Sequence, residues 1–289
     1  MPLWLDDVMA HLIDADTLAA EMERGDVVVL DVQYALMGPP STQLYAAAHL
    51  PGARHLSLDA ALAGPTGQGG RHPLPDPAVL QEALRELGVD DDSRVVVYDQ
   101  QTSLSAGRAW WVLRWAGLND VRVLDGGLAA WQRAGLPTES ALLVSSGETP
   151  ERASGTVTVR AGSLPVVEVE DVPGAAEAGV LLDVRAPERF RGETEPIDPV
   201  AGHIPGAVNL PMGRMQHEDG SFRSPDEIRA IAAEAGVDGS RPVTTSCGSG
   251  VTASQMTLAL ALAGIDSAPY IGSWSGWITD PSRPIATGP

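Results

Sequence analysis

The chain has 289 residues, of which 44% are hydrophobic, so it is long enough for two domains with real cores. Its formal net charge of −19 and its pI near 4.5 argue against nucleic acid and anionic membranes as partners, because both would repel such a chain. A single cysteine excludes an intrachain disulfide and is compatible with a reducing, cytoplasmic location.

The N-terminal stretch "MPLWLDDVMAHLIDAD" has no basic segment and no long apolar core, so we predict no signal peptide. No apolar run reaches about 18 residues, the length expected of a transmembrane helix. The sequence therefore predicts neither a secretory leader nor a membrane span.

Strands and helices alternate along the chain. Short runs rich in valine predict strands at 95–98 and 121–124. Helices are predicted at 75–88, 105–117, 127–135 and 224–236, each ending at a glycine, and the first of these segments also opens with proline. This alternation implies α/β domains, each with a parallel β-sheet flanked by helices on both faces.

The sequence also repeats itself at the scale of a whole domain. Three pairs of similar segments occur in the same order: "VVVLDV" and "GVLLDV" (27–32 and 179–184), "AAHLPGARHL" and "AGHIPGAVNL" (47–56 and 201–210), and "DGGLAAW" and "IGSWSGW" (125–131 and 271–277). Two homologous domains are therefore expected at 1–140 and 159–289. They are joined by a linker at 141–158, a region rich in Ser, Thr, Glu, Gly and Pro.

The single cysteine, Cys247, lies in "SCGSGVTAS", between a predicted strand and a predicted helix. Ligands of parallel α/β folds bind at such junctions. Backbone N–H groups of small loop residues and the positive end of the helix can stabilise an anion carried on the sulfur. We therefore favour a reactive thiol over a buried, inert one. Aligning the two halves places Asp99 where the second half has Cys247.

The motifs "CGSGVTA", "H-[LI]-P-G-A" in two copies, "LLDVRAPERFRG" and "GSWSGW" resemble the tandem rhodanese family over nearly the whole chain. The resemblance implies two rhodanese-like domains with an active cleft between them, the first a degenerate copy with Asp99 at the cysteine position. It also implies a sulfurtransferase that carries sulfur as a persulfide on Cys247. The sulfur donor would be a small molecule, the acceptor cyanide or a thiol such as thioredoxin, and no cofactor or metal would be required. One cysteine suits this chemistry, since no second thiol can close an internal disulfide.

The resemblance also implies the roles of individual residues. A Ser-His-Asp relay would consist of Ser249, His72 and Asp59. Arg189 would bind the donor's carboxylate, as bidentate pairing suits arginine. The loop itself would bind substrate through Gly248, Gly250, Val251 and Thr252.

The identity of the donor depends on two features that oppose each other. The family's 3-mercaptopyruvate branch carries Gly-Ser-Gly after the cysteine, as here, whereas the thiosulfate branch carries two basic residues. The 3-mercaptopyruvate branch usually has a second arginine after Glu-Pro, but this chain has Ile197 and Asp198 there. It also has Ile271 where relatives often carry an acidic residue. We predict 3-mercaptopyruvate as the donor, with thiosulfate as the alternative.

Other interpretations remain open for single residues. His72 could be an exposed loop histidine, Asp59 a helix cap and Arg189 a surface residue. His49 and His203 occupy matching motifs in both halves and are expected to be structural, as is an ion pair formed by Arg185.

Other functional classes fit the sequence less well. A cysteine phosphatase needs an arginine six residues after the cysteine, where this chain has Ala253. A non-catalytic binding module fits the first half better than the second. A metal site is not expected, because no Cys/His pair has ligand spacing. The glycine-rich stretch at 64–75 follows no strand–helix pattern, so a nucleotide loop is not expected there.

Overall fold

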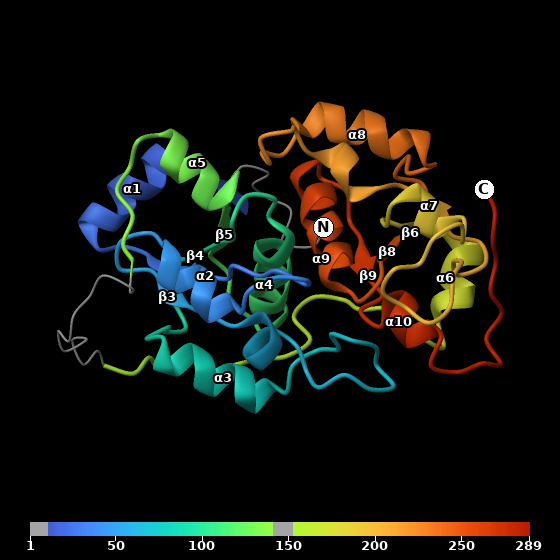
Figure 1. The fold of residues 1–289 in the computed structure, drawn as a ribbon, viewed down its shortest axis with the longest axis horizontal. Helices are drawn as coiled ribbons and strands as arrows, with labels where there is room; N and C mark the ends of the chain where they lie inside the picture. Colours follow the sequence, from blue (N-terminus) through green and yellow to red (C-terminus); the bar gives the residue numbers. More distant parts are fainter. Residues whose placement is uncertain (1–10, 141–152) are drawn as a thin grey trace.

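The computed structural model describes residues 11–140 and 153–289, which form two α/β units side by side (Figure 1). The first ten residues of the stretch tested for a signal peptide lie outside the described residues. So does most of the predicted linker, and the predicted domain boundaries stay a prediction.

The first unit contains a parallel sheet of five strands in the order β1-β5-β4-β2-β3. Its strands are β1 (Leu12–Ile13), β2 (Val28–Asp31), β3 (Arg54–His55), β4 (Val95–Tyr98) and β5 (Val121–Leu124). Its helices are α1 (Ala15–Arg24), α2 (Ser41–Ala47), the π-helix η2 (Leu58–Leu62), α3 (Pro77–Glu86), α4 (Leu104–Trp115) and α5 (Gly127–Arg133).

The second unit has a parallel sheet of four strands in the order β7-β6-β8-β9. Its strands are β6 (Val180–Asp183), β7 (Val208–Asn209), β8 (Val243–Ser246) and β9 (Ala268–Pro269). Its helices are α6 (Val172–Ala178), α7 (Pro187–Phe190), the 3-10 helix η3 (Met212–Met215), α8 (Pro225–Glu234), α9 (Val251–Leu262) and α10 (Ser273–Trp277).

The topology confirms the predicted fold class and the internal repeat. The order β9-β8-β6-β7 in the second sheet repeats the order β5-β4-β2-β3 in the first. The predicted strands at 95–98 and 121–124 are β4 and β5, and the predicted helices correspond to α3, α4, α5 and α8. Local chemistry sets the start of α8, because Ser224 and Glu227 form a capping box ahead of it.

The two units share a core where α4 packs against α9 (Figure 1). Every residue of α9 except Thr252 is buried, because this helix is covered by its own sheet on one side and by the other unit on the other. The helices approach closely at Gly107, where an added methyl group would lie 2.8 Å from the Cα of Gln255. This contact fixes the first unit against the helix that begins beside Cys247.

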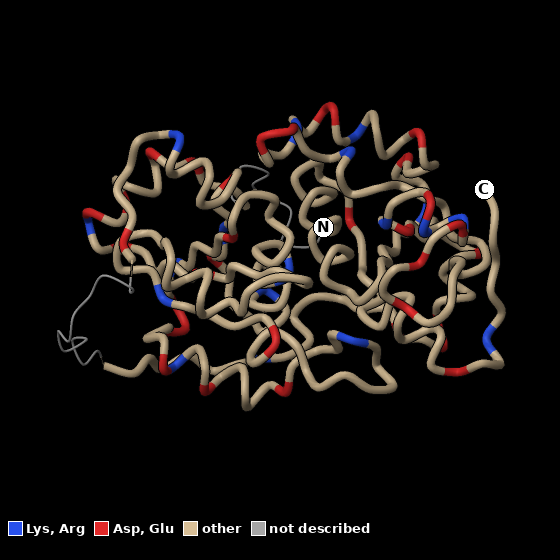
Figure 2. Tube along the Cα trace, in the orientation of Figure 1, with Lys and Arg blue, Asp and Glu red and all other residues tan. Residues whose placement is uncertain are grey.

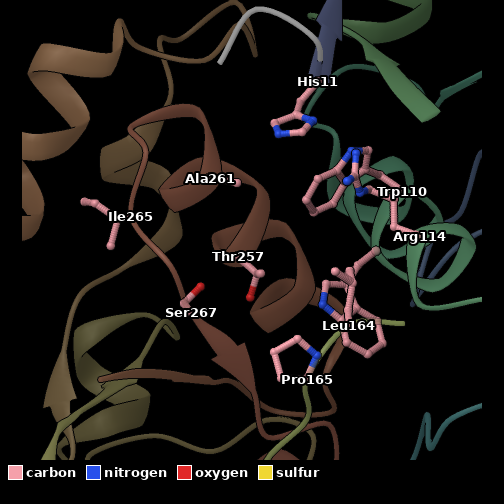
Figure 3. Close-up of a pocket in the computed structure, with 10 residues that line it drawn as sticks. His11, Trp110, Arg114, Leu164, Pro165, Thr257, Ala261, Ile265 and Ser267 are labelled. Atoms are coloured by element: carbon pink, nitrogen blue, oxygen red, sulfur yellow. The ribbon is translucent and has the colours of Figure 1, made fainter. Parts of the chain in front are cut away.

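A small cavity of about 20 Å³ lies at this junction, lined by Trp110 and Arg114 of α4 and by Thr257 and Ala261 of α9 (Figure 3). A single water molecule needs roughly 10–15 Å³ of such volume. The cavity is therefore too small for an organic substrate.

Acidic residues occur along the chain in both units (Figure 2). All 19 basic residues of the chain are arginines. Within the described ranges, no helix combines the length and the apolar character needed to cross a bilayer.

Candidate active site

Cys247 follows the last residue of β8 and precedes α9. The strand register confirms the alignment of the two halves at this point. Asp31 of β2 pairs with Tyr98 of β4, and the corresponding Asp183 of β6 pairs with Ser246 of β8. Asp99 and Cys247 are therefore the next residues on equivalent strands.

The sulfur of Cys247 lies in a cradle of backbone donors. The N–H groups of Ser249 and Gly250 point at Sγ, with N···S distances of 3.4 and 3.1 Å. Val251 and Thr252 form the first turn of α9, where N–H groups have no acceptor within the helix. The cradle and the helix N-terminus together favour negative charge on the sulfur or on an atom bound to it.

The loop can form this cradle because its backbone turns back sharply at Gly250. This residue has a φ of +85°, and a methyl group on it would lie 2.3 Å from the carbonyl oxygen of Ile271. A larger residue at position 250 would therefore both strain the backbone and collide with the neighbouring loop.

Ser273 completes the cradle from α10. Its Oγ accepts a hydrogen bond from the N–H of Cys247 (3.0 Å) and lies 3.8 Å from Sγ. Ser273 has a positive φ of 51°, a conformation uncommon for a residue other than glycine. This strained backbone holds the hydroxyl group beneath the cysteine.

The first unit contributes His72 to the same site. The Nδ1 atom of His72 lies 2.8 Å from Oγ of Ser249, so the predicted Ser-His pair is in hydrogen-bond contact across the two units. On the other side of the ring, Nε2 lies 3.7 Å from Oδ1 of Asp59 and 3.5 Å from the hydroxyl of Tyr34. The Asp59 side chain is 68% exposed, so its contact with His72 is a loose one.

His72 is held in its neutral form. Burial, followed by the positive charges of Arg108 and Arg71, lowers the pKa of His72 to about 4. Arg108 is itself fully buried and donates hydrogen bonds to the backbone carbonyls of Leu62, His72 and Pro73, at 3.0–3.2 Å. At neutral pH the imidazole can therefore accept a proton from Ser249.

Arg189 lies beside the cysteine loop, but its guanidinium group is bonded to two acidic side chains. It donates hydrogen bonds to Glu195 at 2.7 and 3.2 Å and to Asp198 at 3.3 Å. Burial acts to raise the pKa of Glu195, but hydrogen bonds, first from Arg189 and then from backbone N–H groups, outweigh it and lower the pKa. The guanidinium of Arg189 lies close to Gly248, where an added methyl group would be 3.5 Å from Nη2.

In the first unit, the carboxylate of Asp99 occupies the place of the thiol. It accepts hydrogen bonds from the N–H groups of Gln101, Ser103, Ser105 and Ala106, at 3.0–3.3 Å. Burial raises the pKa of Asp99 despite these bonds. The cradle of the first half is thus filled by a side chain that cannot carry sulfur.

Three residues predicted to be structural make structural contacts. Arg185 binds Asp183 at 2.6 Å and the carbonyl of Gly202 at 2.8 Å, behind the cysteine loop. His49 and His203 bond to the backbone carbonyls of Tyr45 and Phe190, at 2.8 and 2.7 Å.

Sequence reasoning missed Tyr34, Arg71, Arg108 and Ser273. Arg71 immediately precedes His72, and Ser273 lies in a repeated motif, but neither position alone signals contact with the cysteine loop. Among the described residues, no group of three His, Cys, Asp or Glu side chains is arranged to hold a metal ion.

The fold and the site define a class of protein: an α/β enzyme of two repeated units, in which one unit holds a cradled cysteine and the other supplies a histidine. The profile of the rhodanese-like domain matches residues 14–134 and 168–280. The chain therefore belongs to the rhodanese family.

Three relatives illustrate this membership. SseB of Mycobacterium tuberculosis, provisionally named a thiosulfate sulfurtransferase, is 42% identical over 96% of this chain and 97% of its own. A Pseudomonas aeruginosa protein, provisionally named a 3-mercaptopyruvate sulfurtransferase, is 44% identical over 96% and 99%. The crystal structure of SseA from Escherichia coli, described as a 3-mercaptopyruvate sulfotransferase, matches with a TM-score of 0.80 at 35% identity, covering 91% of this chain and 98% of SseA.

Proposed function

We propose that the protein is a sulfurtransferase that takes sulfur from 3-mercaptopyruvate onto Cys247 and passes it to an acceptor. The observation that carries this proposal is the 2.8 Å contact between Ser249 and His72, placed next to the cradled thiol. A sulfur donor whose leaving group must be protonated needs such a pair. Thiosulfate, which releases the stable sulfite anion, does not.

In this mechanism the thiolate of Cys247 attacks the sulfur of 3-mercaptopyruvate. An S–S bond forms, the donor's C–S bond breaks, and its electron pair stays on carbon as the enolate of pyruvate. Neutral His72 accepts the donor's thiol proton through Ser249, and the same path returns a proton to the enolate carbon. Cys247 keeps a persulfide, and pyruvate leaves.

The cradle is suited to both states of the sulfur. The N–H groups of Ser249 and Gly250 stabilise the attacking thiolate, and they can equally stabilise the charge that develops on the new persulfide. Asp59 would have a smaller role in proton transfer, because its carboxylate is exposed and lies 3.7 Å from His72. It would orient the ring rather than transfer a proton.

The persulfide would pass to cyanide or to a small or protein thiol such as thioredoxin. Since Cys247 is the chain's one cysteine, any second thiol needed to release the sulfur must come from the acceptor. A reducing, cytoplasmic compartment suits this requirement and is part of the proposal.

Thiosulfate is the second candidate donor, because the surroundings of the cysteine loop carry more positive charge than the loop residues themselves. Gly248, Ser249 and Gly250 carry no charge, yet the guanidinium groups of Arg71 and Arg189 both flank Gly248. A dianion gains more from such groups than a monocarboxylate does. Glu195 and Asp198 offset these charges, which favours the monocarboxylate.

Measuring kcat/KM for the two donors side by side tests the proposal, and we expect 3-mercaptopyruvate to be preferred. In Ser249→Lys, activity with thiosulfate should rise and activity with 3-mercaptopyruvate should fall, because the added cation favours the dianion while the proton path is lost. A wild-type enzyme that prefers thiosulfate would overturn the donor assignment.

A further inference from the structure

The cysteine loop has a second cationic neighbour, Arg71, which comes from the other unit. A methyl group placed on Gly248 would lie 3.0 Å from Nη2 of Arg71 and 3.5 Å from Nη2 of Arg189. Gly248 directly follows Cys247, so an anion held between these two guanidinium groups would be next to the reacting sulfur. The two arginines approach this point from different units.

Arg71 is fixed in this position by contacts at both ends. Its backbone N–H donates to Oγ of Ser275 in α10 (3.1 Å), and its carbonyl accepts from the hydroxyl of Thr66 (3.0 Å). Its Nη1 atom donates to Oδ1 of Asp198, whose other oxygen binds Arg189. The side chain of Asp198 is 3% exposed, so one buried carboxylate ties the two arginines together.

Arg71 has N–H donors that its ion pair with Asp198 does not use. Its Nε atom is buried and, among the described residues, has no hydrogen-bond partner. The only hydrogen bond from its guanidinium to another described side chain goes through Nη1. Arg189, in contrast, already uses Nε and Nη2 for Glu195 and Asp198. Beside Gly248, a donor carboxylate would therefore find the Nη2 group of Arg71 and the Nη1 group of Arg189, neither of which bonds to another described side chain.

We propose that Arg71 is the second substrate-binding arginine of this site, delivered by the first unit in place of the arginine missing at Ile197 and Asp198. It binds the carboxylate of a 2-oxo acid donor together with Arg189, and Asp198 positions both. This inference rests on the proposed function, because it assigns the donor's carboxylate to a particular pair of residues.

Pyruvate, the expected product, is a probe that needs no turnover. We expect Arg71→Ala to weaken pyruvate binding, measured by titration calorimetry, by about tenfold or more, the scale of a lost hydrogen bond to a charged group. The KM for 3-mercaptopyruvate should rise by a similar factor with a smaller change in kcat. Arg71→Lys should recover part of the affinity, since it restores charge without the bidentate fork.

Two further variants separate substrate binding from a structural ion pair. Asp198→Asn keeps an oxygen that accepts from Arg71 but removes the competing charge, so pyruvate binding should be unchanged or tighter. If Arg71 only holds the units together, Arg71→Ala and Asp198→Asn should lose affinity and thermal stability in parallel, which would overturn the assignment. Arg191→Ala, which breaks an exposed pair with Glu193, is the matched control and should leave pyruvate binding unchanged.

Pyruvate binding by the wild type distinguishes the Arg71 assignment from the proposed function. Failure of the wild type to bind pyruvate would contradict the proposed function, and the Arg71 assignment would fall with it. Equal pyruvate binding by the wild type and Arg71→Ala would overturn the Arg71 assignment alone.

Discussion

Replacing Ser249 by alanine removes the hydroxyl group that lies 2.8 Å from Nδ1 of His72. The backbone N–H of residue 249, which points at Sγ from 3.4 Å, remains in place. The cradle for the thiolate is therefore kept while the proton path to His72 is cut. Activity with a donor whose leaving group needs a proton should therefore fall selectively.

The expected size of the effect follows from the role of the pair. Positioned proton transfer contributes about 10²–10⁴-fold to a rate. His72 stays in the site and a water molecule can take the place of the hydroxyl, so we expect the lower end of that range. The kcat/KM for 3-mercaptopyruvate should fall about 100-fold, or about 2.7 kcal/mol of transition-state stabilisation. With thiosulfate the change should be under about threefold, because general acid catalysis is not needed for sulfite to leave.

The assay measures both donors on the same preparations, with cyanide as acceptor. Ser254→Ala is the matched control: this buried serine on α9 donates its hydroxyl hydrogen bond to the carbonyl of Gly250 rather than to His72. We expect it to affect both donors alike. An equal loss with both donors in Ser249→Ala would refute the relay, because it would show that Ser249 acts only by shaping the loop.

Three other outcomes follow from the same geometry. Because the pKa of His72 is lowered to about 4, it loses its role as a base only below that pH. The acid limb of kcat/KM for 3-mercaptopyruvate, which reports the free enzyme, should thus lie near pH 4, and an acid limb near pH 6.5 would contradict this role of His72. Asp99→Ala should lower Tm by leaving four buried N–H groups unpaired, with turnover of the folded enzyme nearly unchanged; a turnover loss of about 100-fold would mean that the first unit is catalytic. Asp59→Asn should cost less than about tenfold in kcat, since the carboxylate is exposed; a larger loss would make Asp59 an obligatory relay member.

Most of the fold could be predicted from the sequence, because each unit follows local rules. The buried strand at 95–98 consists of three valines and a tyrosine, all residues that favour strands, and helices α3 and α8 carry their own caps. Alignment of the two halves places Asp99 at the position equivalent to Cys247, and the strand register agrees. The strand and the caps depend on residues close together in the chain, and the equivalence of Asp99 and Cys247 follows from comparing short segments of the two halves.

The site was less predictable because it is assembled from both units. Arg71 and Asp198 are 127 positions apart, and nothing local to either residue indicates that they meet. In the sequence, Asp198 looks only like a lost arginine, whereas in the structure it ties Arg71 to Arg189. Likewise, the positive φ of Ser273 is set by its contacts with the cysteine loop rather than by its residue type.

The central claim is that Cys247 carries the sulfur, and intact-protein mass spectrometry tests it most directly. After treatment with 3-mercaptopyruvate in the absence of an acceptor, the wild type should gain the mass of one sulfur atom and lose it when cyanide is added. Cys247→Ser, with its fold intact by circular dichroism, should gain nothing. Sulfur added to the Ser variant, or a wild type that turns over the donor without ever carrying the added mass, would contradict the account.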